Sequence, residues 1–402
     1  MAFKLEAAQE KLLNAVGIMP VECIPLAECW RRVLAETVTA NIDCPPFNHS
    51  LLDGYAVIAE DVAQAAPDNP IVLRQIDNVP AGSIAREQVI SGTACRIMTG
   101  APLPPGATGV VGLEDTVADG DMVKVLAGKN ASKKVGLQGE EFAYGEDLLA
   151  AGTVINSGVM AMMGVLGKAR PQVFKKPRVA IIATGSEIIP VEAPLAPGKI
   201  RNSNSYMLGG QIYDSGGQPV FLGCVRDDVN EIAGLISKAS ECDLVITTGG
   251  ASAGDYDLIG EVFKKLDIKI LFDQINIKPG KAVLVGVKDG KPYMGLSGNP
   301  AAAAISAEQL VRPLLMKISG RTQWWRPKAR AVLVSPFGKN AGAKRFVWGN
   351  CWQDRNGWQV QSLKDQGKGT FKSAVAANCL IVIPENSPPL PASTEVEVLL
   401  LI

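Results

Sequence analysis

The chain has 402 residues, of which 47% are hydrophobic and 20% charged, as in ordinary soluble globular proteins. Its 40 basic residues balance its 40 acidic residues, which gives no support to a general nucleic-acid-binding or membrane-surface role. The chain holds one histidine, His49, and this excludes a zinc site with several histidines from a single chain. We therefore expect acid, base and metal-ligand chemistry to depend on carboxylates.

The eight cysteines are scattered and form no Cys-x-x-Cys pair, which is typical of reduced thiols rather than of a zinc site or a disulfide framework. Cys44 precedes His49 by five residues, and we favour a histidine that shapes a loop over a catalytic pair. No stretch approaches the ~20 apolar residues of a membrane span, and the N-terminus is too mixed for a signal peptide. These features predict a cytoplasmic protein of about two to four domains.

The N-terminal part of the chain opens with a predicted helix over residues 3–17, because Leu5, Ala8, Leu12 and Val16 fall on one face. Short strands and turns follow from 57 to 126. They include strands at 71–73, 95–98, 109–113, 116–117 and 122–123. The Asp119–Gly120 pair between the last two predicts a hairpin turn. We interpret this region as a small inserted β domain.

Strands and helices alternate from residue 178 onward. We predict strands at 179–184, 220–225 and 244–247, with helices at 206–214 and 229–240 between them. Continuous apolar strands that alternate with helices indicate a parallel sheet covered on both faces. Ligands bind beyond the carboxyl ends of the strands in such sheets.

A second β pattern closes the chain, with predicted strands at 331–334, 346–349, 358–360, 380–383 and 396–401. The predicted fold is multidomain, α/β plus β: a central α/β domain with a mostly parallel sheet, an inserted N-terminal β domain and a small C-terminal β barrel, with a sandwich as the alternative. The predicted boundaries are 1–45 with 135–170 for a linker domain, 46–134 for the inserted domain, 171–320 for the α/β domain and 321–402 for the C-terminal domain.

Three glycine-rich loops lie within sixty residues, each at the end of an apolar run. Glycine lets the backbone approach a phosphate closely, and a following helix N-terminus adds partial positive charge. Lysines at two positions supply further positive charge. The residues that we predict to bind substrate in these loops are Gly249, Gly250, Ser252, Lys278, Lys281, Gly298, Asn299 and Pro300. We therefore expect an anion site here rather than three structural turns.

Five carboxylates fall beyond strand ends that the sheet topology gathers at one edge: Glu187, Asp227, Asp228, Asp255 and Asp257. Carboxylates beside glycine loops and lysines suit a magnesium–phosphate site. The alternative is that they cap the helices that follow, as Asp228 before Val229 is placed to do. Asn202 and Asn204 carry the same two alternatives, a helix cap or a ligand contact.

Three further segments, when each is taken alone, are interpreted as ordinary structural features rather than as parts of a site. Asp53–Gly54 reads as an ordinary turn, Thr99 lies in a small-residue loop after a strand, and Glu140–Glu141 reads as a surface acidic pair. The chain has no Gly-x-x-x-x-Gly-Lys-Ser/Thr loop, and Gly249–Gly250 lacks the Gly-x-Gly-x-x-Gly spacing. These absences argue against a P-loop nucleotidase and a Rossmann dinucleotide site.

Taken together, however, the motifs resemble those of the molybdopterin molybdenumtransferase family, which includes bacterial MoeA proteins and the gephyrin E domain. The match covers almost the full length, and the joint order of the motifs is specific where each alone is weak. The motifs begin at Asp53, Arg96, Gly139, Thr184, Val225, Gly249, Lys278 and Gly298.

The resemblance implies an elongated homodimer of four-domain subunits, with dimerisation through the linker domain. It implies that adenylylated molybdopterin binds at the α/β domain, that the partner subunit completes the cleft, and that molybdate is inserted with Mg²⁺ and release of AMP. Molybdopterin adenylyltransferase and molybdoenzyme apoproteins are the further partners implied. The residues matched to catalytic positions are Asp53, Glu187, Asp227 and Asp257, with Glu187 and Asp227 as Mg²⁺ ligands. Thr99, Glu141, Asn202 and Asn204 join the loop residues above as substrate-binding positions.

The chain departs from the family pattern at several positions, and some of these are positions that the family uses near molybdate. The departures are Gln274, Ala282, Ser297, Ala302, Trp348 and Lys368. Alanine and tryptophan supply fewer hydrogen-bond donors to an oxyanion, while Arg345 and Lys368 are candidates to compensate. Two alternatives therefore stay open beside the transferase: a diverged paralogue that carries molybdopterin or inserts another metal such as tungsten, and a scaffold for protein interaction.

Overall fold

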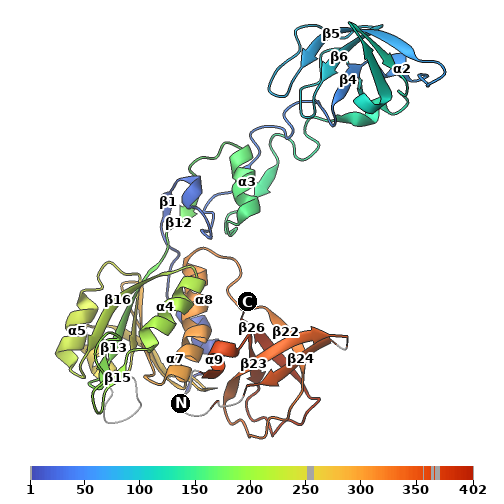
Figure 1. Ribbon diagram of the computed structural model, residues 1–402. Helices are drawn as coiled ribbons and strands as arrows, with labels where there is room; N and C mark the ends of the chain where they lie inside the picture. The colour runs from blue at the N-terminus through green and yellow to red at the C-terminus, as the bar shows by residue number, and fades with distance from the viewer. Residues whose placement is uncertain (1, 251–257, 356, 364–365, 367–371, 402) are drawn as a thin grey trace. The chain divides into compact units, whose positions relative to one another are not determined.

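The computed structural model describes residues 2–250, 258–355, 357–363, 366 and 372–401. The chain divides into two compact units, each with its own core. The first contains Met1–Glu36, Ala151–Met160 and Ala169–Ile402, and the second contains Thr37–Ala150 and Ala161–Lys168. Figure 1 labels several elements of each unit.

A six-stranded sheet forms the centre of the first unit, in the order β16-β13-β17-β21-β20-β18. The first four strands run parallel, and the last two pair antiparallel to their neighbours. Their bounds are β13 (Arg178–Thr184), β16 (Gln218–Val225), β17 (Leu244–Thr248), β18 (Lys269–Gln274), β20 (Ala282–Lys288) and β21 (Lys291–Leu296). The predicted parallel sheet is confirmed for the strands that the sequence pattern identified, and an antiparallel edge extends it.

Helices cover both faces of this sheet because alternate side chains of its strands are apolar on each side. Ile181 and Ile246 pack with α1, α4, α7, η4 and α8, whereas Ile182 and Val245 pack with α5 and α6. The two layers are visible in Figure 1. The bounds are α1 (Leu5–Asn14), α4 (Asn204–Asp214), α5 (Val229–Ser237), α6 (Leu258–Lys265), α7 (Pro300–Ser306), the π-helix η4 (Ala307–Val311) and α8 (Arg312–Ile318).

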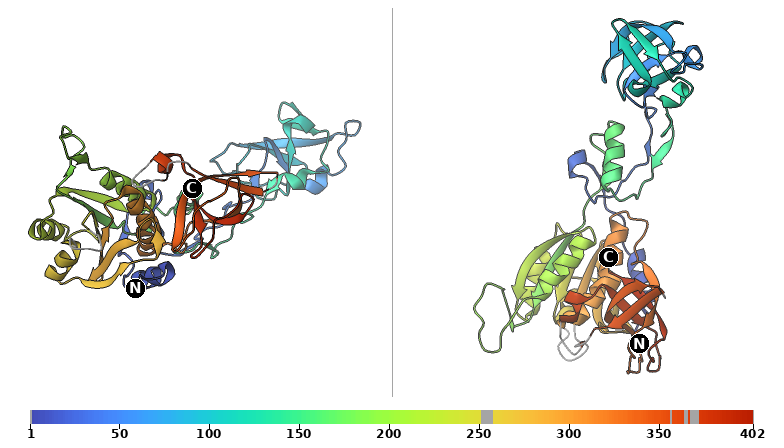
Figure 2. Two further views of the ribbon diagram at one scale, coloured as in Figure 1. Left: turned by 90° about the horizontal axis from the view of Figure 1, so that it is seen from below. Right: turned by 45° about the vertical axis from the view of Figure 1, so that its right-hand side comes forward.

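The C-terminal strands of the first unit form a closed barrel. Strand β23 pairs with both β24 and β25, which closes the ring β23-β24-β22-β26-β25. Their bounds are β22 (Lys328–Leu333), β23 (Lys344–Asp354), β24 (Gly357–Ser362), β25 (Cys379–Ile383) and β26 (Glu395–Leu400), with α9 (Lys372–Ala376) beside them. The short strand β19 (Ile277–Lys278) pairs in parallel with the start of β23. Figure 2 shows the barrel strands in orange and red. The barrel was predicted, and the sandwich alternative was wrong.

The second unit is built on another six-stranded sheet, in the order β7-β4-β6-β5-β9-β8. Its strands are β4 (Gly54–Val57), β5 (Ile71–Val79), β6 (Thr93–Ile97), β7 (Gly109–Gly112), β8 (Thr116–Asp119) and β9 (Met122–Val125), with α2 (Ala59–Val62). Gly120 has φ +67 between β8 and β9, as the predicted hairpin turn requires.

Short pairings and turns complete the two units. The paired strands are β1 (Val21–Cys23) with β12 (Gln172–Phe174), β2 (Val38–Thr39) with β11 (Asp147–Leu149), β3 (His49–Ser50) with β10 (Val135–Gly136), and β14 (Ile188–Ile189) with β15 (Ile200–Arg201). The remaining elements are α3 (Ser157–Val165) and the short helices η1 (Leu26–Glu28), η2 (Leu113–Asp115) and η3 (Ala131–Lys134).

Three predicted helices differ from the observed ones at their ends, and the helix predicted over 206–214 begins at Asn204. The helix predicted over 3–17 spans Leu5–Asn14, and the helix predicted over 229–240 ends at Ser237. The four-part division with boundaries near 46, 135, 171 and 321 stays a prediction. In the part of the chain that is described, no helix combines the length and the apolar character needed to cross a membrane.

Candidate functional site

A cavity of about 630 Å³ opens at the carboxyl ends of the parallel strands β13 and β17. We call it the strand-end cavity. Its described lining residues are Thr184, Gly185, Glu187, Asp227, Gly249, Gly250, Leu258, Ala282, Ser297 and Gly298. Strand ends of a parallel sheet meet at one edge, so residues far apart in sequence converge there. Five residues predicted for the site are therefore brought together: Glu187, Asp227, Gly249, Gly250 and Gly298.

Close backbone contact explains the glycines of this cavity. Gly249 has φ +108, and a Cβ atom at this position would lie 2.1 Å from the carbonyl oxygen of Thr184. Only glycine fits such a conformation without strain. The Thr184 hydroxyl faces the same two glycines, because a Cβ on Gly250 would lie 3.3 Å from its Oγ1. That hydroxyl is buried and has no hydrogen-bond partner among the described residues, which leaves it available to a ligand.

The two neighbouring aspartates at the end of β16 have different roles. The Asp228 carboxylate accepts hydrogen bonds from the backbone N–H groups of Asn230 (2.8 Å) and Glu231 (2.9 Å), so it caps α5. The Asp227 carboxylate instead lines the cavity and accepts from the backbone N–H of Ser186 at 2.9 Å. The helix-capping alternative therefore holds for Asp228, whereas Asp227 remains a candidate for ligand chemistry.

Asn204 connects two of the glycine loops through hydrogen bonds of its side chain. Its Nδ2 donates to Thr248 Oγ1 (2.7 Å) and to the carbonyl oxygen of Gly298 (2.9 Å), and the residue is 8% exposed. Its Oδ1 is buried without a partner among the described residues. Asn202 is also buried, and it accepts from the backbone N–H of Ser205 at the start of α4. Asn204 thus positions the loops, and Asn202 stabilises the start of a helix.

A second cavity of about 660 Å³ lies between the loop after β19, the start of α7 and the barrel. We call it the cationic cavity, because Lys278, Lys339 and Arg345 line it and none of its described lining residues is acidic. The Arg345 Nε is buried and has no described hydrogen-bond partner, and its guanidinium lies 5.5 Å from the centre of the Phe337 ring. This cavity is therefore suited to an oxyanion.

The loop that joins β21 to α7 contributes to both cavities. Ser297 and Gly298 line the strand-end cavity, and Asn299 lines the cationic cavity. Asn299 also caps α7, since its Oδ1 accepts from the backbone N–H of Ala302 at 3.1 Å. Lys281 and Pro300 are absent from the described linings of both cavities, although the sequence predicted them for the site.

Several positions flagged from the sequence have a definite place in the cationic cavity. Ala302 and Trp348 line it, and Trp348 is 8% exposed because it also packs in the main core. The backbone of Trp348 is held by Gln366, which accepts from its N–H at 2.8 Å and donates to its carbonyl oxygen at 2.7 Å. Trp348 therefore forms a rigid apolar wall. The predicted residues Ser252 and Asp257 lie outside the described residues, as do Asp255 and Lys368.

Two basic residues near the cavities were missed from the sequence. Lys199 precedes β15, and its Nζ donates to the carbonyl oxygen of Ser186 at 2.7 Å, next to the carboxylates of the strand-end cavity. Lys339 lies in a loop of the barrel and enters the cationic cavity. Neither stands in a motif, so only the folding of distant segments brings them to the site.

The second unit holds Asp53, Thr99 and Glu141. Asp53 Oδ1 accepts from the Thr99 backbone N–H and from its hydroxyl, both at 2.8 Å. The backbone donor is the main reason that the pKa of the Asp53 carboxyl is below its usual value. Glu141 accepts a weak hydrogen bond from the Cys44 thiol at 3.5 Å, and this contact raises the pKa of the thiol further than burial does alone. Cys44 thus contacts a carboxylate, while His49 lies in a strand, where the sequence predicted a loop.

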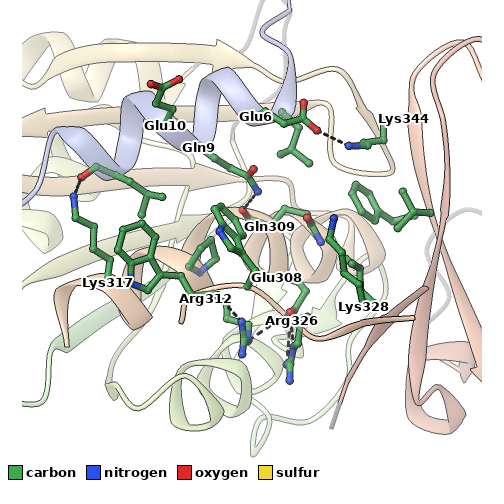
Figure 3. Close-up of a pocket in the computed structure, with 18 of the residues that line it drawn as sticks. Glu6, Gln9, Glu10, Glu308, Gln309, Arg312, Lys317, Arg326, Lys328 and Lys344 are labelled. Carbon is green, nitrogen blue, oxygen red and sulfur yellow. Dashed lines mark hydrogen bonds and ion pairs between the residues drawn. The ribbon is translucent and has the colours of Figure 1, made fainter. Parts of the chain in front are cut away.

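A third cavity, of about 650 Å³, lies between α1, the segment from η4 to α8, and the barrel. Figure 3 shows ion pairs between several of its charged side chains, Glu6 with Lys344 and Glu308 with Arg312 and Arg326, whereas Glu10 is drawn without an interaction. Lys317 donates to the carbonyl oxygen of Leu13. Because most of these charges are already compensated, this cavity offers fewer groups for catalysis than the other two.

Three family models match successive parts of the chain. They describe the MoeA N-terminal region (residues 3–167), a probable molybdopterin-binding domain (180–317) and the MoeA C-terminal region (330–401). A molybdopterin molybdenumtransferase of Staphylococcus epidermidis RP62A is 36% identical over 94% of this chain and 90% of its own length. The molybdopterin molybdenumtransferase of Staphylococcus aureus MRSA252 is 33% identical over 98% of this chain and 95% of its own length.

The chain belongs to the molybdopterin molybdenumtransferase family. Solved structures agree with this assignment. The MoeA protein of Pyrococcus horikoshii OT3 is 32% identical and superposes with a TM-score of 0.83 over the full length of both chains. A second structure of a Pyrococcus horikoshii MoeA protein gives a TM-score of 0.86 at 31% identity, again over both full lengths. As a member of this family, the chain is a transferase of molybdenum cofactor biosynthesis. The predictions of family and enzyme class are confirmed.

Proposed function

We propose that this transferase inserts molybdenum from molybdate into adenylylated molybdopterin with release of AMP, assisted by Mg²⁺. The observation that carries the proposal is a pair of cavities of opposite charge that share one loop, Ser297–Gly298–Asn299. The acidic cavity suits a metal-bound phosphoanhydride, and the cationic cavity suits an oxyanion. The reaction needs both at neighbouring positions.

The residues of the strand-end cavity fit a Mg²⁺ ion. Mg²⁺ is usually held by one or two carboxylates together with substrate phosphates, and Glu187 and Asp227 supply two carboxylates. The described residues contain no group of three or more His, Cys, Asp or Glu side chains arranged around a metal position, so the phosphates would complete the coordination. A bound Mg²⁺ would neutralise phosphate charge during cleavage of the phosphoanhydride bond.

The residues of the chain have distinct tasks in this proposal. Glycines 249, 250 and 298 let the phosphates approach the backbone, and Asn204 holds two of their loops in place. The Thr184 hydroxyl supplies a donor that has no other described partner. Lys199 fixes the turn at Ser186 that also orients the Asp227 carboxylate. Water adds across the phosphoanhydride bond as it breaks, so that AMP leaves from this cavity and the other phosphate stays on molybdopterin.

Molybdate is the substrate that we assign to the cationic cavity. Lys278, Lys339 and Arg345 offer positive charge without a described competing carboxylate. Arg345 is the side chain with the clearest capacity for a further bond, because its buried Nε has no described partner. Arg345 and Lys339 thereby compensate for the donors that Ala302 and Trp348 lack.

The remaining parts of the proposal come from the family. We propose a cytoplasmic homodimer in which the partner subunit completes the cleft and supplies Asp53, held ionised by Thr99. Molybdopterin adenylyltransferase would provide the substrate, and molybdoenzyme apoproteins would accept the product. The named relatives favour the transferase over a scaffold or a carrier without turnover.

The test is the release of AMP from adenylylated molybdopterin with Mg²⁺, measured without oxyanion, with molybdate and with tungstate. The proposal predicts molybdate-dependent release, together with a product that activates a molybdoenzyme apoprotein. Tight substrate binding without release on either oxyanion would refute it. If AMP is released with tungstate but not with molybdate, the reaction type stands and only the assignment of molybdenum as the inserted metal is refuted.

A further inference from the structure

Five basic residues surround a small hollow on the first unit, which shares no described lining residue with the cavities described above. The segments that meet there are the turn before Val33, the end of β12, the turn after α4 and the turn after α8. The lining residues are Arg31, Arg32, Val33, Phe174, Lys175, Lys176, Gly216, Ser319 and Arg321. We call the five basic residues the basic cluster. None of the described lining residues is acidic, so the cluster concentrates positive charge.

One carboxylate among the described residues pairs with the basic cluster. Glu22 pairs with Arg32, whose guanidinium also donates to the carbonyl oxygen of Phe174 at 2.8 Å. Arg321 receives no such compensation: burial lowers its pKa, and the positive charge of Arg31 lowers the pKa further. The positive charges of the basic cluster therefore repel one another, and a bound anion would reduce this repulsion.

Arg31 adds a second unfavourable feature. Its φ is +59, in the left-handed region that disfavours residues with a Cβ atom. The conformation is fixed by its backbone N–H, which donates to the carbonyl oxygen of Ile155 at 2.9 Å. The fold therefore keeps an unfavourable backbone conformation at a residue whose positive charge acts on Arg321.

Two guanidinium groups of the basic cluster each have a hydrogen-bond donor with no described partner. The Nε atoms of Arg32 and Arg321 are buried and have no described hydrogen-bond partner, and Arg32 is 8% exposed. Gly216 leaves room for the Arg321 guanidinium, since a Cβ there would lie 3.3 Å from its Nη2. The hollow measures about 10 Å³, which is room for one oxygen atom rather than for a whole anion.

We propose that the basic cluster binds a multivalent oxyanion of the phosphate type. One oxygen would enter the hollow between Arg32 and Arg321, and the remaining oxygens would face the exposed side chains of Arg31, Lys175 and Lys176. Guanidinium groups bind such oxygens through charge-assisted hydrogen bonds. This site is independent of the two substrate cavities and of the proposed reaction.

The experiment is calorimetric titration of the full-length protein with inorganic phosphate and pyrophosphate at constant ionic strength. The Lys278→Gln background suppresses binding in the cationic cavity. Arg31→Asn removes the charge and keeps a residue that tolerates positive φ. We expect it to weaken phosphate binding about tenfold, the loss expected for a charged hydrogen-bond partner. Arg31→Lys retains the charge and should bind within about threefold of the parent.

Thermal unfolding provides a second readout that does not depend on affinity. Without phosphate, Arg31→Asn should unfold about 1–3 °C above the parent, because repulsion and strain are relieved. Phosphate should raise the unfolding temperature of the parent and of the control Arg330→Gln by more than that of Arg31→Asn, because the variant binds phosphate more weakly. Equal phosphate binding in the parent and Arg31→Asn would overturn the proposal. A rise in the parent's unfolding temperature with sodium chloride as large as its rise with phosphate would also overturn it.

Discussion

The strand-end cavity and the cationic cavity have almost the same volume, about 630 and 660 Å³, yet opposite charge. Carboxylates and glycines line the first, and two lysines and an arginine line the second. The difference follows from topology. The parallel ends of β13 and β16 bring Glu187 and Asp227 together, whereas the pairing of β19 with β23 sets Lys278 beside Arg345. One loop between the cavities can then present a phosphoanhydride to one and an oxyanion to the other.

Breaking the backbone contact beneath the strand-end cavity should have the largest effect. Gly249→Ala places a Cβ 2.1 Å from the carbonyl oxygen of Thr184 and forces a residue with a side chain to φ +108. We expect a loss of about 2–4 kcal/mol in the free energy of unfolding and loss of AMP release. Denaturant unfolding and the AMP assay measure these effects. Gly234→Ala in α5 meets no atom within 4 Å and should be neutral or stabilising.

The next test separates the two neighbouring aspartates. Asp227→Asn removes a carboxylate from the cavity and should lower the rate of AMP release by about 100-fold or more, with an unchanged unfolding temperature. Asp228→Asn keeps an efficient helix cap and should retain near-normal rates. Steady-state kinetics on both variants decides. Equal losses in the two would contradict the division of roles.

The cationic cavity should respond in a different kinetic parameter. Arg345→Gln removes one charged donor, and we expect the KM for molybdate to rise about tenfold while the affinity for adenylylated molybdopterin stays unchanged. Arg330→Gln is the matched control, because this exposed arginine of β22 lies 4.0 Å from Glu395 and lines neither cavity. An unchanged KM for molybdate in Arg345→Gln would show that Arg345 does not bind the oxyanion.

The smallest expected effect concerns Asp53. Thr99→Val removes the hydroxyl donor and leaves the backbone donor, so the lowered pKa of Asp53 should rise part of the way to its usual value. A lowered pKa contributes stability that is lost as pH falls below about 4, and this loss should be smaller in Thr99→Val. NMR titration of the carboxyl carbon measures the pKa. Thr99→Ser keeps the hydroxyl and should titrate as the parent does.

The sequence predicted those parts of the site that depend on local chemistry and strand order. Apolar strands that alternate with helices identified the edge at which Asp227 and Gly249 meet. It did not predict Lys199 or Lys339, since each reaches its cavity through contacts between segments distant in sequence. The role of Asn204 was equally difficult to predict, because one acceptor, Thr248, ends β17 and the other, Gly298, lies in the loop before α7.

The same limit explains the predicted residues that the cavities leave out. Lys281 and Lys278 are three residues apart and looked equivalent in the sequence, but Lys278 alone is among the described residues that line a cavity. Asn202 stands two residues from Asn204, yet it stabilises the start of α4 instead of bracing a loop. Spacing along the chain identified the loops, and tertiary packing decided which side chains face a ligand.

Equilibrium binding of molybdate to Asp227→Asn and to Arg345→Gln tests the central claim most directly. If the two cavities divide the substrates, Asp227→Asn binds molybdate as the parent does although it no longer releases AMP. Arg345→Gln then binds molybdate about tenfold more weakly. Loss of molybdate binding in Asp227→Asn, with normal binding in Arg345→Gln, would contradict the account and assign the oxyanion to the strand-end cavity.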